Sequence, residues 1–250
     1  MRSFNGAGIG FAAHSTHSRH KIYFKKIEYW ERITHFVIMV KTYMSEELIS
    51  RIVFFIVIIF SAVIHEVMHG VVAGWFGDDT AREEGRITLN PIPHIDLFGT
   101  ILLPAVLILL HSPVILGAAK PVPVNVNNMR HRRLGMALVS LSGPLSNFGL
   151  AIIAGLALVF GAGQIPGAGE LLAIIAITNV VLGTFNLIPV PPLDGSKVIA
   201  SILPDRFMYT LLSFERYGFI LVIILLYAGL LDRILLPVLN FYFRLFGFSL

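Results

Sequence analysis

The feature that most constrains this chain is an apolar run over residues 49–76, which is long enough to cross a bilayer. About 20 predominantly apolar residues span the hydrocarbon core as a helix. This run also contains His65, Glu66 and His69. Each ionisable group at membrane depth costs about 2.5–3.5 kcal/mol on insertion scales. The run therefore predicts a spanning helix whose polar side chains share a stabilising partner, and a metal ion is such a partner.

The rest of the chain extends this pattern to a whole membrane domain. Hydrophobic residues make up 56% of the chain and charged residues only 14%, against about half and about a quarter in soluble proteins. Further apolar segments occupy 98–119, 134–160, 171–188, 217–231 and 234–250. Prolines interrupt the first of these, which fits a re-entrant hairpin or a kinked span, and the last fits a span or an interfacial helix. We expect an all-α polytopic protein with a bundle of about four to six transmembrane helices.

The first 43 residues differ from the remainder. They are basic and contain four histidines, and no apolar stretch there is long enough for a signal peptide. We interpret residues 1–43 as a disordered tail or as sequence outside the native protein, and 44–250 as a single domain. The net charge of +4 comes from this tail, so it does not indicate a nucleic-acid partner. Basic residues at 130–133 and 197–216 predict cytoplasmic loops.

The sequence His-Glu-x-x-His at 65–69 is the strongest chemical signal. On a helix, His65 and His69 lie one turn apart on the same face and can reach one zinc ion at about 2.1 Å. Glu66 lies beside that face and can take a proton from a zinc-activated water and pass it to a leaving amine. The chain has no cysteine, which excludes thiolate ligands and a cysteine nucleophile. The pattern also arises by chance in soluble helices, but burying three ionisable groups in a membrane favours the metal.

Zinc needs a third protein ligand, and the candidates are Asp194, Asp96 and His94. His65 lies about 20 Å along the first span at 1.5 Å per residue. The span at 171–188 runs in the same direction by the charge rule and reaches a similar depth at its end. Depth therefore favours Asp194 as the ligand. The alternative is that Asp194 caps a loop beside Gly195.

Two asparagines are candidate substrate contacts. Three prolines in "NLIPVPPLDG" prevent a regular helix, and such chain at membrane depth lines a cavity or lies within protein. Asn186 is placed there to bind a substrate backbone, and a hydrogen bond between helices is the alternative. Asn147 in "SGPLSN" is a second candidate. The small residues Gly143 and Ser146 of that motif indicate close helix packing.

Together these motifs resemble the site-2 protease family of intramembrane zinc metalloproteases. The resemblance rests on "HEVMH" in the first span, "SGPLSN" in the next clear span and "FNLIPVPPLDG" in the one after it. The segments "RITLNPIPHID" and "GAAKPVPVN" are similar to compact members that lack PDZ and CBS domains.

The resemblance implies one Zn²⁺ per chain, held by His65, His69 and Asp194, with Glu66 as catalytic base. It implies a substrate that is the transmembrane segment of another protein, cut within the lipid bilayer. It also implies that "GRITLN" forms a small membrane-associated β element that pairs with the substrate. We expect a multi-pass protein of a prokaryotic cell membrane. The sequence leaves its oligomeric state open.

Two other functions remain open at this stage. A zinc protease whose site faces the cytosol would cut soluble proteins, which the depth of His65 argues against. A metal transporter also keeps histidine and aspartate inside a bundle, but it has no need of Glu66 beside the ligands.

Overall fold

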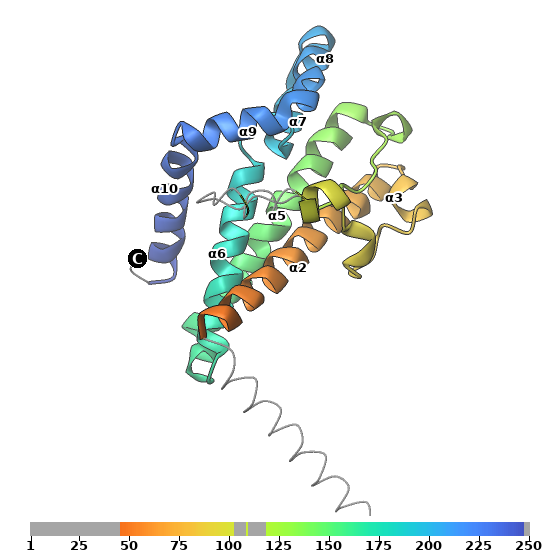
Figure 1. Ribbon diagram of the computed structural model, residues 1–250. Helices are drawn as coiled ribbons and strands as arrows, with labels where there is room; N and C mark the ends of the chain where they lie inside the picture. The colour runs from red at the N-terminus through yellow and green to blue at the C-terminus, as the bar shows by residue number, and fades with distance from the viewer. Residues whose placement is uncertain (1–45, 103–108, 110–118, 248–250) are drawn as a thin grey trace, which may run out of the picture. The chain divides into compact units, whose positions relative to one another are not determined.

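The computed structural model describes residues 46–102, 109 and 119–247 (Figure 1). The chain divides into two compact units, Met1–Ile52 and Val53–Leu250, and the site lies in the second. The predicted tail at 1–43 and most of the segment at 98–119 lie outside the described residues. The interpretation of both segments stays a prediction.

The described residues are helical, which confirms the predicted all-α class. Three helices are long, namely α2 (Glu46–Trp75), α5 (Arg132–Val159) and α6 (Ala168–Asn186). The shorter α-helices are α3 (Thr80–Glu83), α7 (Asp194–Ile202), α8 (Asp205–Ser213), α9 (Gly218–Tyr227) and α10 (Leu230–Leu245). Single turns connect them at η1 (Ile92–His94), η2 (Leu97–Leu102), η3 (Val126–Asn128), η4 (Ala162–Gln164) and η5 (Phe214–Tyr217).

Among the described residues, α2, α5 and α6 are the three helices long and apolar enough to cross a membrane. Large apolar side chains on α2 and α5 point outward; Phe54 is 43% exposed and Ile153 is 65% exposed. Such surfaces are stable against lipid rather than water. Helix α9 has ten residues, about 15 Å, which is shorter than a hydrocarbon core of about 30 Å. Spans beyond these three stay a prediction.

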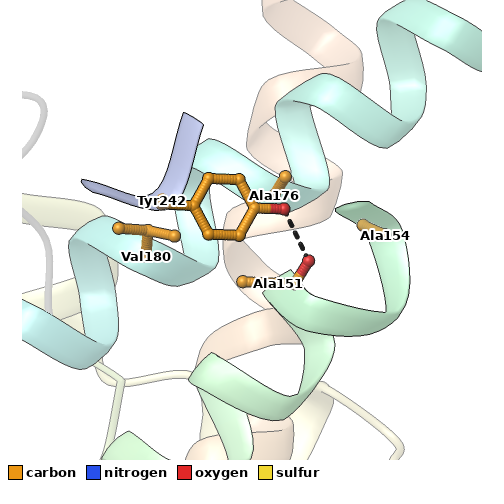
Figure 2. Packing of buried hydrophobic residues seen from close by; sticks show 5 residues of the cluster. All are labelled: Ala151, Ala154, Ala176, Val180 and Tyr242. Atoms are coloured by element: carbon orange, nitrogen blue, oxygen red, sulfur yellow. Dashed lines mark hydrogen bonds between the residues drawn. The ribbon is translucent and has the colours of Figure 1, made fainter. Parts of the chain in front are cut away.

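Small residues allow α5, α6 and α10 to pack closely. Figure 1 shows α5 and α6 side by side, with α10 against α6. Figure 2 shows the buried cluster between them, formed by Ala151, Ala154, Ala176, Val180 and Tyr242. The Tyr242 hydroxyl donates a hydrogen bond to the Ala151 carbonyl at 2.7 Å. This bond satisfies the one polar group that the cluster buries, and it fixes α10 against α5.

A buried aspartate organises the chain that follows α2. Asp78 accepts hydrogen bonds from the Asn125 backbone N–H at 2.6 Å, from the Asn128 amide at 3.1 Å and from Thr80. Burial alone would raise the pKa of Asp78, but these donors outweigh it and hold the pKa below its ordinary value of 3.8. Asp78 thereby ties the end of α2 to the segment 119–128.

The expected β element is not formed, because residues 85–90 contain no strand. Their backbone groups bond elsewhere. The Arg86 N–H donates to the Ala81 carbonyl, and the buried His94 ring donates to the Thr88 carbonyl at 3.0 Å. The Arg86 guanidinium donates to the Lys120 carbonyl at 2.8 Å. The Arg86 side chain therefore supports the backbone at residues 120 and 121, and the segment does not pair as a strand.

Residues 187–193 connect α6 to α7 without helical structure, as the three prolines predict. The turn folds back closely on itself. A Cβ at Gly195 would overlap the Leu187 carbonyl, so only glycine fits there. This close turn brings Asp194, the first residue of α7, back toward α2.

Candidate metal centre

Three buried side chains from two distant parts of the sequence meet at one point. His65 and His69 come from α2, and Asp194 begins α7. The Asp194 Oδ2 atom lies 3.0 Å from His65 Nε2 and 3.1 Å from His69 Nε2. All three residues are less than a tenth exposed. The fold therefore presents two imidazole nitrogens and one carboxylate oxygen to the same small volume.

The far nitrogen of each imidazole is held by an oxygen. His65 Nδ1 lies 2.6 Å from Asn147 Oδ1, and His69 Nδ1 lies 2.6 Å from the Val139 carbonyl. Both oxygens are acceptors, so each Nδ1 carries a proton, and in a neutral ring the Nε2 lone pair then faces Asp194. Two lone pairs facing a carboxylate repel one another unless a cation lies between them.

The donor set fits zinc. Ligands at about 2.0–2.1 Å from a tetrahedral zinc lie about 3.3 Å from one another, close to the two separations found here. Two histidines and a carboxylate are also the protein ligands of known catalytic zinc sites. Gly143 on α5 leaves room for the rings, because a Cβ there would lie 2.5 Å from His65 Nε2.

Glu66 is a second carboxylate near the two histidines. Its carboxylate, His65 and His69 offer ligand atoms within 4.8 Å of one another. However, Glu66 Oε2 accepts a hydrogen bond from the Val122 backbone N–H at 2.8 Å. Because Asp194 Oδ2 is close to both Nε2 atoms, we take Asp194 as the better third ligand. Glu66 then lies beside the ligand set, where a carboxylate could accept a proton.

A cavity of about 330 Å³ opens on this centre. Glu66, His69 and Asp194 line its polar side. The apolar wall is formed largely by Pro121, Val122, Val124, Val126, Met136 and Val139. Lys197 also lines the cavity, and its Nζ lies 3.7 Å from Asp194 Oδ1. The cavity therefore combines a metal-binding group, a carboxylate and an apolar surface that an extended apolar chain could contact.

The other predicted site residues do not line the cavity. In the described part of the chain, the His94 ring donates to the Thr88 carbonyl at 3.0 Å, and Asp96 Oδ2 accepts from the Gly99 N–H at 2.5 Å. The Asn186 amide donates to the Leu182 carbonyl at 3.0 Å, and neither Asn186 nor Asn147 lines the cavity. Asn147 has no exposed surface, and its amide faces His65.

The sequence reasoning missed Asn179 and Ser61. Asn179 lies on α6 with no exposed surface, and it hydrogen-bonds both Asn147 and Ser61. A signal was present, because Asn179 is an amide inside a long apolar helix, and such a residue needs a partner in lipid. The identity of that partner could not be read from spacing along the chain.

The chain is also similar in sequence to known proteins. Residues 162–228, which include Asp194, match Peptidase family M50. The chain is 40% identical over 193 residues to the Bacillus subtilis (strain 168) protein named "Putative zinc metalloprotease YwhC", covering 74% of this chain and 84% of that protein. It is 28% identical over 190 residues to "Putative zinc metalloprotease Rip2" of Mycolicibacterium smegmatis (strain ATCC 700084 / mc(2)155), covering 76% of this chain and 72% of that protein. No solved structure matches the chain.

These matches agree with the geometry of the site. The similarity to the Bacillus protein extends over most of both chains, and the family match includes the segment that carries Asp194. The His-Glu-x-x-His helix supplies the other half of the centre. The chain belongs to peptidase family M50, the site-2 protease family, and is a metalloendopeptidase.

Proposed function

We propose that this protein is an intramembrane zinc protease that cuts peptide bonds within the transmembrane segments of other membrane proteins. The observation that carries the proposal is the position of the centre. His65, Glu66 and His69 lie in α2, and their partners come from α5 and from the segment after α6. Helices α2, α5 and α6 have the length and composition to cross a bilayer, and Asp194 begins α7 just after the turn that follows α6. A site within such helices is reached most directly by a substrate that is itself in the membrane.

We assign one zinc ion to His65, His69 and Asp194. A zinc ion at this position would polarise the peptide carbonyl and make water a stronger acid. Glu66 takes the proton from the attacking water and later donates it to the leaving nitrogen. The Val122 N–H holds Glu66 Oε2 at the cavity while these protons move.

The cavity wall suggests how the substrate lies. Residues 121–126 run without strand structure along the cavity, and Pro121 and Pro123 offer no backbone donors. An extended substrate segment can lie along Val122, Val124 and Val126, whose side chains are apolar. Asn186, in the last turn of α6, is the proposed contact to the substrate backbone beside residues 187–193.

We propose that it is a multi-pass protein in the membrane of a prokaryotic cell. Its proposed partners are the lipid bilayer and the transmembrane segment of a membrane-protein substrate.

The direct test is co-expression with a tagged single-span reporter, comparing wild type with Glu66→Gln at equal protein level. Glu66→Gln keeps all three proposed ligands and removes the base, so reporter cleavage should be lost while zinc binding persists. A matched control is Glu83→Gln, an exposed carboxylate on α3 away from the cavity. Equal cleavage by wild type and Glu66→Gln would remove Glu66 as the base. If wild type cleaves a soluble unfolded protein as fast as the membrane reporter, the intramembrane part of the proposal is wrong.

A further inference from the structure

A chain of three buried polar side chains connects the backbone of α6 to the imidazole of His65. Its members are Ser61 on α2, Asn147 on α5 and Asn179 on α6. Ser61 is 4% exposed, and both asparagines are fully buried. No member lines the cavity. Polar groups with this degree of burial in apolar helices need a specific arrangement of donors and acceptors.

The orientation of both asparagine amides follows from one backbone acceptor, the Ile175 carbonyl. The Asn179 Nδ2 atom lies 2.8 Å from the Ile175 carbonyl, which can only accept. The amide nitrogen of Asn179 therefore points at its own helix, and its Oδ1 points at Asn147. This oxygen accepts from Asn147 Nδ2 at 2.8 Å. The orientation of the Asn147 amide follows, with its own oxygen facing His65.

This orientation determines which nitrogen of His65 carries the proton. Asn147 Oδ1 lies 2.6 Å from His65 Nδ1, so Nδ1 must donate. The Nε2 lone pair is then available on the side of Asp194. If the Asn147 amide were rotated by half a turn, its NH₂ group would face Nδ1. The His65 proton would then move to Nε2 and block ligation there.

We propose that Asn179 is a positioning residue that fixes the orientation of the Asn147 amide and, through it, the metal-binding tautomer of His65. Within the described part of the chain, the one other acceptor bonded to Asn147 Nδ2 is the Ser61 carbonyl at 3.4 Å, a long contact that holds the amide weakly. The inference rests on the proposed role of His65 as a zinc ligand.

The test is the affinity of the purified full-length protein for Zn²⁺, measured by competition with a chelator. Asn179→Leu removes the acceptor for Asn147 at similar volume, and we expect zinc affinity to fall about 10–100-fold. Thr184→Val is the matched control, because Thr184 is buried on the same helix and its hydroxyl has no hydrogen-bond partner among the described residues. Its zinc affinity should equal that of wild type.

Measuring Asn179→Leu in a protein that already carries Asn147→Asp separates an orienting role of Asn179 from a packing role. In Asn147→Asp, both side-chain oxygens accept, so either one can face His65 Nδ1 and no orientation has to be selected. Asn179→Leu should therefore change zinc affinity less than threefold in this background. An equal loss in both backgrounds would mean that Asn179 acts by packing, and would overturn the proposal. No loss in the wild-type background, or no zinc binding by Asn147→Asp alone, would overturn it too.

If Asn179→Leu does not fold, Asn179→Ala is measured in the same two backgrounds with the same expectations. Failure of the orienting role of Asn179 is distinguishable from failure of the proposed function. Unchanged zinc affinity in Asn179→Leu, together with full reporter cleavage by wild type, would contradict only the orienting role. Wild-type protein that binds zinc but cleaves no better than Glu66→Gln removes only the proposed function.

Discussion

The carboxylate of Glu66 accepts a hydrogen bond from the backbone N–H of Val122 at 2.8 Å. Val122 lies between Pro121 and Pro123, so its N–H is the only backbone donor in that three-residue stretch. Asp78 and Arg86 hold the chain on either side of this stretch, at Asn125 and at Lys120. The loop after α2 is thus built to present one donor to the glutamate of the His-Glu-x-x-His helix.

We expect Val122→Pro to lower the rate of reporter cleavage about tenfold, because it removes one hydrogen bond to the proposed base. Val122→Ala keeps the N–H and is the control for the loss of side-chain volume. Zinc content should be unchanged in both variants. Equal rates for Val122→Pro and Val122→Ala would show that this hydrogen bond does not position Glu66.

Gly143→Ala should displace the imidazoles, because the added Cβ would lie 2.5 Å from His65 Nε2 and 2.6 Å from His69 Cε1. We expect loss of bound zinc, together with destabilisation of about 1–3 kcal/mol from overpacking. Gly149→Ala on the same helix is the control, since a Cβ there meets no described atom within 4 Å apart from the neighbouring backbone of its own helix. Zinc content and thermal unfolding of the two variants measure the difference. A Gly143→Ala protein with full zinc content would contradict this description of the site.

Chelation should abolish reporter cleavage, and added Zn²⁺ should restore it. Asp194→Ala should bind zinc far more weakly than wild type because it removes the proposed carboxylate ligand. Asp79→Ala, an exposed aspartate outside the cavity, serves as the control. Zinc affinity that is the same in Asp194→Ala and wild type would exclude Asp194 as a ligand.

Substrates that carry Gly, Pro or Asn within the span should be cut faster than matched all-Leu spans. A helix must open to expose its peptide bonds, and opening it in lipid leaves backbone groups without partners. Residues that weaken the helix reduce this penalty. The measurement is the cleavage rate across a reporter series, with the same residue placed outside the span as control. Cleavage rates that do not depend on the residue within the span would contradict this prediction.

Asp78→Asn should destabilise the protein by about 1–3 kcal/mol near neutral pH, because hydrogen bonds to a buried charged group are lost. The pKa of Asp78 lies below its ordinary value of 3.8 in the folded protein. Its contribution is therefore complete above pH 3.8 and is lost as pH falls through the folded pKa. Unfolding temperatures of wild type and Asp78→Asn in detergent should converge once the pH has fallen below the folded pKa of Asp78. A gap that stays constant with pH would mean that the charge of Asp78 contributes nothing.

Local pattern was enough to predict the three long helices. The apolar runs correspond to α2, α5 and α6 within a few residues at each end, because a spanning helix satisfies its own backbone hydrogen bonds. The same local geometry places His65 and His69 on one face of α2. The strand expected at "GRITLN" did not form. Alternation along the chain cannot supply a pairing partner, and Arg86 and His94 bond to backbone carbonyls there instead.

The sequence by itself therefore determined the membrane helices and the pair of imidazoles on one of them, since both depend on residues within a few turns of one another. Only the tertiary structure decided which groups meet those imidazoles. It brings Asp194 to both Nε2 atoms, Val122 to Glu66, and Asn179 through Asn147 to His65. These contacts join residues more than thirty positions apart. They depend on how α2, α5, α6 and the close turn before α7 pack, and that packing is not encoded in any one segment.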